Sequence, residues 1–293
     1  MAEQGGGVPD GLQAPVVPRM ILGRKLQRFR ENVGVTPDEA GYRIRASRSK
    51  ISRMENGRVG FKERDVEDLL DFYKVTDAEA CAEALALARL ANVSNWWDSF
   101  GDVLPDWVQQ YLGLESAASS IRCFEQQFVP GLLQTREYAQ AVALLAPEGT
   151  DTDDIAQRVD IRVKRQALLT RKDPPQVWTV VDEGVLRRPL GGRGAMHAQL
   201  AFLAELARLP HVTLQVVPFA RGGHAASGGP FTMLRFGEPD VPDLVYLEQL
   251  TSAVYLDKPK DIRLYSKVMD RLGAKALTPP QTLDFLTEIR DET

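Results

Sequence analysis

Arg48, Ser49, Lys50 and Arg53 lie within one short polar stretch, and their side chains suit contacts with a nucleic acid. An arginine can span two acceptors on guanine, and serine and lysine can bind bases or phosphates. In a helix, Arg53 lies one turn beyond Ser49 and Lys50 and faces the same way. This is the pattern of a helix that enters the major groove by its N-terminal end. The alternative is that these side chains are only a solvated surface.

Local signals place this stretch on the second of two short helices. Thr36-Pro37-Asp38-Glu39 predicts a helix start, with Thr36 as N-cap, proline at the first helical position and Glu39 closing a capping box. That helix must end near residue 44 or 45. Ser47 then predicts the N-cap of a helix over 48–55, and Asn56-Gly57 predicts its end.

Three further helices complete the predicted N-terminal domain. Apolar residues recur on one face from about residue 20 to 33, where Gly34 predicts a stop, and similar patterns cover 62–73 and 77–91. Five short helices in so few residues indicate a compact all-α domain with a helix-turn-helix, which we assign to residues 19–92. Residues 1–18 are rich in glycine and proline and predict a disordered arm.

Residues 93–293 predict a larger domain of mixed α/β class. Valine-, phenylalanine- and tyrosine-containing runs bounded by Gly, Pro or Asp predict strands, and helical runs are interspersed, which favours one curved sheet. The strands are expected at 120–128, 176–181, 212–219, 230–236, 244–250 and 253–256, and the helices at 136–145, 153–170, 195–208, 259–272 and 279–289. A short turn plus helix is expected within 95–114.

The charge distribution is uneven. The chain of 293 residues has a net charge of −4, but residues 19–62 hold twelve Lys or Arg and only four acidic residues. An acidic body with one basic segment predicts a local contact with a polyanion. Two cysteines predict neither a disulfide framework nor a metal site, and no apolar run has the length of a membrane span. No secretory signal is visible, so we expect a cytoplasmic protein.

The run Ser47-Arg-Ser-Lys-Ile-Ser-Arg-Met-Glu-Asn-Gly57, within residues 20–75, resembles the recognition helix of the phage repressor/Cro-like (XRE) helix-turn-helix family. The resemblance implies that Arg48, Ser49 and Arg53 face base edges. It also implies that Asn56 and Arg58 meet phosphate, and that Arg30 and Glu55 form a partly buried structural ion pair. From their positions we add Lys50 to the base-reading set, and Arg43 and Lys62 to the phosphate contacts.

Two departures from that family bear on the site. The usual glutamine after the capping threonine is Pro37 here, which removes one phosphate contact. The turn position, usually glycine, is Arg45, which carries a steric cost if its φ is positive. We therefore expect a turn that is looser than usual.

Several motifs after residue 110 resemble the C-terminal domain of the actinobacterial toxin–antitoxin-like (WhiJ-type) transcriptional regulators. That resemblance implies regulation of development or specialised metabolism, together with a small partner protein encoded nearby. The motifs, in order, are 111–115, 124–125, 129–135, 137–139, 187–192, 212–218 and 228–232.

Other features of the C-terminal domain have two interpretations each. The apolar run 129–134 is either a partner-binding or dimer-forming ridge or a buried turn. The loop Gly222–Gly229 either cradles an anion or is a mobile hairpin tip. Gly191-Gly-Arg-Gly194 lacks the ending of a P-loop. The histidines His197, His211 and His224 are scattered and match no catalytic or metal motif, so we expect no enzyme, no cofactor and no metal.

We therefore predict a sequence-specific DNA-binding transcriptional regulator that acts as a homodimer on double-stranded DNA. Its C-terminal domain is expected to dimerise and to bind a small protein or ligand that changes DNA affinity. The alternative is an antitoxin-like interaction protein that sequesters a small partner and binds DNA mainly for autoregulation. No membrane contact is expected.

Overall fold

The computed structural model describes residues 15–100, 103–146, 151–239 and 241–293. Its contacts divide the chain into two compact units. One holds the described residues up to Ser99 together with Val108–Ala117 and those of Glu238–Val241, and the other holds the remainder. The predicted domain limits of 19–92 and 93–293 stay a prediction, because units defined by packing need not coincide with domains.

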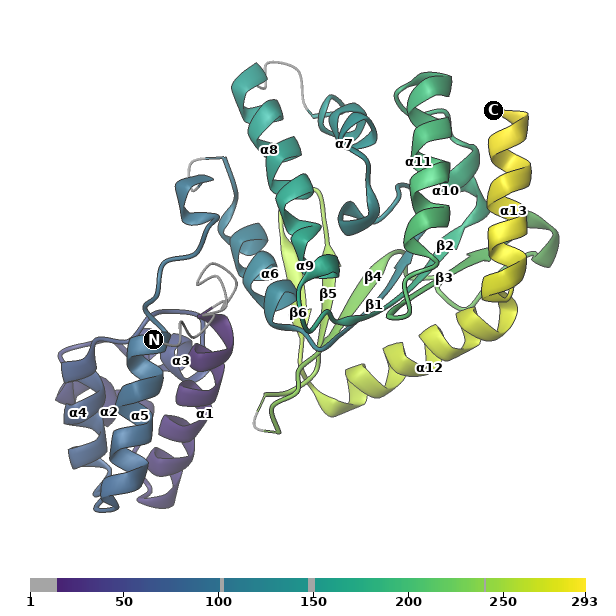
Figure 1. Cartoon of the computed structure of the whole chain (residues 1–293). Coiled ribbons are helices and arrows are strands. Elements are labelled where there is room, and N and C mark those ends of the chain that lie inside the picture. The colour runs from purple at the N-terminus through teal and green to yellow at the C-terminus, as the bar shows by residue number, and fades with distance from the viewer. Residues whose placement is uncertain (1–14, 101–102, 147–150, 240) are drawn as a thin grey trace, which may run out of the picture. The chain divides into compact units, whose positions relative to one another are not determined.

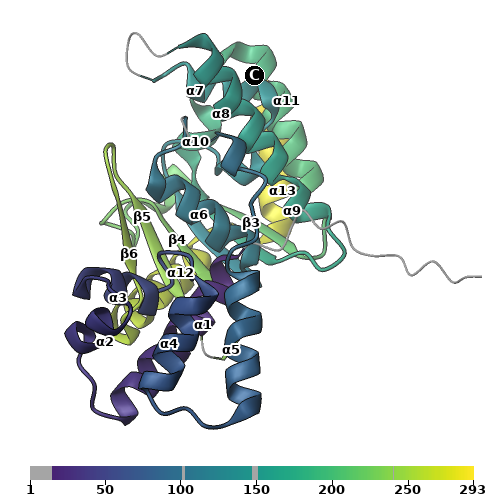
Figure 2. The same ribbon diagram turned by 90° about the vertical axis from the view of Figure 1, so that its left-hand side faces the viewer.

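Five helices form the N-terminal part of the first unit, as the sequence predicts, and Figure 2 shows them as a bundle in which α1 contacts α3 and α5. They are α1 (Val16–Asn32), α2 (Pro37–Arg43), α3 (Arg48–Glu55), α4 (Glu63–Phe72) and α5 (Ala78–Leu90).

The first helix begins four residues earlier than expected. Residues 1–14 of the predicted arm lie outside the described residues, but Val16, Val17 and Pro18 form the first turn of α1. A proline is tolerated there because the first N–H groups of a helix have no intrahelical acceptor. Val16 is buried, which explains why this turn is ordered by packing despite its composition.

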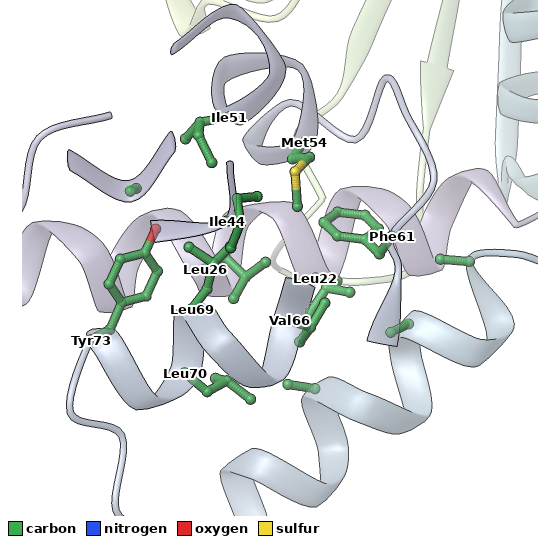
Figure 3. Close-up of a cluster of buried hydrophobic side chains, with 14 residues drawn as sticks. Leu22, Leu26, Ile44, Ile51, Met54, Phe61, Val66, Leu69, Leu70 and Tyr73 are labelled. Carbon is green, nitrogen blue, oxygen red and sulfur yellow. The ribbon is translucent and has the colours of Figure 1, made fainter. Parts of the chain in front are cut away.

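A single apolar core holds the five helices together. Figure 3 shows Leu22 and Leu26 of α1 facing Ile51 and Met54 of α3, with side chains of α4 closing the cluster from the other side. Ten of its members are labelled there: Leu22, Leu26, Ile44, Ile51, Met54, Phe61, Val66, Leu69, Leu70 and Tyr73. Each is less than a tenth exposed, so α3 is fixed by its inner face and its outer face is left to solvent.

The segment after α5 contains a 3-10 turn, η1 (Asp98–Phe100), and a helix, α6 (Asp106–Ala117). Both match the turn plus helix expected there. Residues 108–117 of α6 belong to the first unit, where Gly113 approaches Val16 and Trp97.

The second unit is built on one six-stranded sheet with the order β3-β2-β1-β4-β5-β6. β1 pairs in parallel with β2, and β2 with β3, whereas β4, β5 and β6 continue from β1 as an antiparallel meander. The strands are β1 (Ser120–Glu125), β2 (Gln176–Asp182), β3 (Val212–Val217), β4 (Phe231–Arg235), β5 (Leu244–Glu248) and β6 (Ala253–Leu256).

Helices cover both faces of this sheet. α12 (Pro259–Lys275) crosses one face, and Figure 1 shows α8 (Thr152–Arg165) and α11 (Gly192–Leu206) on the opposite side. The remaining helical elements are η2 (Gly131–Leu133), α7 (Arg136–Ala143), α9 (Ala167–Thr170), α10 (Glu183–Arg187), η3 (Phe219–Arg221) and α13 (Pro279–Glu292). The predicted fold class, a helical helix-turn-helix region followed by a mixed α/β domain, is confirmed.

Most of the expected elements are present with ends shifted by a few residues, and three differences have a local explanation. The expected helix 153–170 is divided at Gln166 into α8 and α9. The third strand ends at Val217, because Pro218 cannot donate to a ladder and leads into η3. The sequence-based prediction missed α10, a five-residue helix whose Gly184 N–H is capped by Asp182 at 2.9 Å.

Candidate nucleic-acid interface

The two helices of the candidate interface are capped as the sequence predicts. The Thr36 side chain accepts from the Glu39 backbone N–H, and the Glu39 side chain accepts from the Thr36 N–H at 2.7 Å. Ser47 Oγ accepts from the Lys50 N–H at 3.2 Å, which starts α3 at Arg48. At its other end the Arg58 N–H donates to the Arg53 carbonyl and Gly57 has a φ of 65°, which is a Schellman motif.

The turn between α2 and α3 is tight, so the expectation of a loose turn is wrong. Arg45 adopts a φ of 54°, and the Ala46 N–H donates to the Gly41 carbonyl at 2.8 Å. This closes a second Schellman motif with arginine where glycine is usual. A left-handed conformation costs a non-glycine residue about 1–2 kcal/mol. The turn also requires Gly41, because a β-carbon there would lie 2.7 Å from the Ala46 carbonyl oxygen.

Two glycines bring α3 close to α1. A β-carbon on Gly23 would lie 2.4 Å from the Met54 carbonyl oxygen, and one on Gly57 would lie 2.8 Å from the Met20 backbone. The backbones are therefore nearly in contact, with no side chain between them. This close approach fixes the direction in which the outer face of α3 points.

A buried ion pair provides a second link between α1 and α3. Arg30 Nε donates to Glu55 Oε1 at 2.6 Å, and a terminal nitrogen of Arg30 donates to Glu55 Oε2 at 3.0 Å. The remaining nitrogen donates to the Val35 carbonyl at 2.9 Å. The hydrogen bond to Glu55 raises the pKa of Arg30. The structure thus contains the pair that the family resemblance implies, with both side chains 9% exposed.

The four base-reading candidates differ in their surroundings. Arg48, Ser49 and Arg53 are exposed on the outer face of α3, although an exposed ion pair of 3.5 Å joins Arg48 to Asp38. Lys50 is drawn away, because its ammonium lies 2.8 Å from the carboxylate of Asp65, which is only 14% exposed. Ser49 and Arg53 are thus available to a duplex as they stand, Arg48 has to exchange only an exposed ion pair, and Lys50 must first leave the half-buried Asp65.

The four phosphate candidates also separate into two kinds. Arg43 pairs with Asp71 of α4 at 2.9 Å, so its charge is compensated within the protein. The Asn56 side chain donates to the Ser52 carbonyl at 2.7 Å and caps α3. Within the described ranges, the exposed side chains of Arg58 and Lys62 have no hydrogen bond or ion pair. These two are best placed to hold phosphates.

Two residues beside α3 were not selected from the sequence. Arg45 is exposed at the turn, and its side chain has no partner among the residues described. Tyr42, the penultimate residue of α2, is 90% exposed. The available signal was its position on the polar face of α2, opposite Ala40 and Ile44, where an aromatic side chain is unusual.

The structure bears on two features of the C-terminal domain, the apolar run 129–134 and the loop Gly222–Gly229. In the run 129–134, Val129, Leu132, Leu133 and Gln134 are all buried, which favours the buried turn over a ridge. The Tyr138 hydroxyl accepts from the Val129 N–H at 3.1 Å and anchors this turn. In the glycine-rich loop, His224 packs edge-on against Phe124 and Lys275 donates to the Gly223 carbonyl.

The described residues contain no group of three or more side chains that could together hold a metal ion. Among the same residues, no helix is both long enough and apolar enough to cross a bilayer.

Comparison with known proteins gave two family matches. A family model described as a helix-turn-helix domain matches residues 21–82, which contain the capped helices described above. A second model, described as a domain of unknown function (DUF5753), matches residues 108–288. No curated protein and no solved structure matched the chain. The helix-turn-helix domain indicates a DNA-binding regulator, and because the second model spans more than half of the sequence, the chain belongs to the DUF5753 family.

Proposed function

We propose that the protein is a sequence-specific transcriptional regulator that reads DNA with the outer face of α3. The observation that supports this most directly is the exposure of Arg48, Ser49 and Arg53 on a helix whose inner face is fixed to α1 by core packing and the Arg30–Glu55 pair. Long donors on a rigid helix can reach base edges in the major groove with little loss of conformational freedom. Arg58 and Lys62 would bind phosphates and set the register.

A single helix of this length reads few base pairs, so the proposal includes a homodimer. Two copies would contact half-sites about 34 Å apart along the duplex. We further propose that the C-terminal domain takes part in dimerisation and binds a small partner protein or ligand, as in the WhiJ-type regulators, and that it has no catalytic activity. The protein would act on DNA in the cytoplasm, at the nucleoid.

The test begins with selection of binding sites from a pool of random duplexes, followed by affinity measurements for every single-base variant of the selected site. Arg53→Ala is expected to lose about 1–3 kcal/mol at particular base pairs and little at the others. Arg89→Ala is the matched control, because Arg89 is an exposed arginine of the same unit, 66% exposed on α5 and remote in sequence from α3. Equal weakening by Arg53→Ala on every sequence, or equal effects of the two variants, would contradict base reading.

The antitoxin-like alternative makes a different prediction. If sequestration of a partner were the main role, a small protein would co-purify in stoichiometric amount and would bind equally well to Arg53→Ala. No contact described above favours that alternative, so the regulator is the function that we propose.

A further inference from the structure

The outer face of α12 carries a row of exposed cations. Lys260, Arg263, Lys267 and Arg271 are all exposed, and they occupy positions i, i+3, i+7 and i+11 of the helix. At about 100° per residue they fall within an arc of roughly 80°, and they extend over about 16 Å of helix. We call these four residues the α12 basic stripe.

The opposite face of α12 is committed to the core of the second unit. Met269 and Leu272 are fully buried, and Ile262, Tyr265 and Val268 pack against the same cluster under the sheet. The helix therefore cannot offer an apolar face to a membrane without unfolding the domain. Its outer face has one exposed large apolar side chain, Leu264.

The protein does not neutralise the stripe. Within the part of the chain that the structure describes, none of the four side chains has a hydrogen bond or an ion pair. Residues 258–275 hold six Lys or Arg and two Asp, although the whole chain has a net charge of −4. Like charges four residues apart on a helix destabilise it, so Arg263, Lys267 and Arg271 bring no stability to the fold by their charges.

The chemistry of the stripe favours a duplex over a protein as its partner. The centre of a protein interface is depleted of charged residues and enriched in apolar ones, whereas Leu264 is the single large apolar residue exposed here among the described residues of α12. Rows of Lys and Arg with few apolar neighbours bind the phosphate backbone, which presents closely and regularly spaced negative charges.

We propose that the α12 basic stripe is a second DNA-binding surface, which holds the phosphate backbone without reading sequence. This proposal rests on the proposed function, because it assigns to the C-terminal domain a share of the same DNA complex. Its role is affinity: each phosphate neutralised releases counterions, so binding through the stripe makes affinity depend more steeply on salt.

The test is the salt dependence of binding to a long duplex of random sequence, measured by fluorescence anisotropy with the full chain. The stripe variant carries Lys260→Gln, Arg263→Gln, Lys267→Gln and Arg271→Gln. The matched control carries Lys172→Gln, Arg193→Gln, Arg208→Gln and Arg221→Gln, which removes the same charge from exposed cations scattered over the second unit. Thermal melting of both variants is expected to match the wild type, because the side chains replaced in the stripe have no partner among the described residues.

The slope of log affinity against log salt is expected to become shallower by about 3 to 4 in the stripe variant and to change by less than about 1 in the control. The double variant Lys267→Gln/Arg271→Gln is expected to show about half of the change in slope of the stripe variant. Equal slopes for the stripe variant and the control would overturn the proposal. Equal slopes together with loss of binding to polyglutamate in the stripe variant alone would identify an acidic protein segment as the partner instead.

Failure of this proposal is distinguishable from failure of the proposed function. If the wild type binds its selected site with the base-specific dependence on Arg53 and the stripe variant keeps the full slope, only the second surface is refuted. If the wild type binds no duplex at low salt, both proposals fail.

Discussion

Replacing Gly23 by alanine tests the close approach that holds α3 on α1. A β-carbon at Gly23 would lie 2.4 Å from the Met54 carbonyl oxygen and 2.6 Å from that of Glu55. Both are backbone atoms at the C-terminal end of α3, which cannot rotate out of the way as a side chain can. The new methyl group therefore has to push α3 away from α1.

Two opposing effects decide the sign of this change. In an unobstructed helix, alanine is more stable than glycine by about 1 kcal/mol. Overpacking that displaces side chains and backbone costs about 1–3 kcal/mol. Contacts this short with two backbone carbonyls belong at the upper end of that range, so we expect a net loss of about 2 kcal/mol. That corresponds to a roughly thirty-fold rise in the population of the open state.

Hydrogen exchange of the full chain, followed by mass spectrometry, measures this loss locally. Peptides from α1 and α3 are expected to exchange about thirty-fold faster in Gly23→Ala, with peptides from β2 unchanged. Gly194→Ala is the matched control, because Gly194 also lies in a helix but has nothing within 4 Å of the position that a β-carbon would take. That variant is expected to be as stable as the wild type or more so. If Gly23→Ala were equally benign, the contact between the two backbones would be refuted.

Three more predictions concern buried or strained groups. Glu55→Gln leaves the Arg30 guanidinium buried without its carboxylate and is expected to cost about 3–5 kcal/mol in urea denaturation, most of it recovered in Arg30→Met/Glu55→Leu. A double variant as unstable as Glu55→Gln would contradict this prediction. Arg45→Gly removes an arginine from the left-handed conformation and is expected to stabilise the protein by up to about 1 kcal/mol in thermal melting. Relief of a backbone strain of about 1–2 kcal/mol outweighs the greater chain entropy that glycine loses on folding. A lower melting temperature would argue against the tight turn. Burial raises the pKa of Glu125 from 4.5 to about 8. The folded state then binds the extra proton, so the free energy of unfolding is expected to fall as pH rises through that window. Glu125→Gln should abolish this slope, and a variant that kept it would assign the titration to another group.

The capped helices of the candidate interface could be predicted from the sequence because their signals are local. Thr36 and Glu39 satisfy each other's backbone groups across three residues, and Ser47 and Gly57 start and end α3 within a turn of the groups they bind. Such hydrogen bonds depend on neighbours in the chain and little on the rest of the fold. For the same reason the sequence predicts the start of α3 at Arg48 and its end near Glu55, and the period of the helix predicts that Arg48 and Arg53 lie on one outer face.

Only the tertiary structure decided how the charged side chains are used. Lys50 pairs with Asp65, 15 residues away, and Arg43 pairs with Asp71, 28 residues away, and neither pairing can be read from local spacing. The positive φ of Arg45 also became known only from the structure. The Ala46 N–H and the Gly41 carbonyl close that turn whichever residue stands at position 45. The basic residues of α12 can be recognised in the sequence. The packing of Met269 and Leu272 against the sheet determines which face of that helix is exposed to solvent. Local sequence signals determine which groups α2 and α3 carry and where these two helices begin and end, because the capping groups are neighbours in the chain. Packing between distant elements determines which of those groups remain available to a partner.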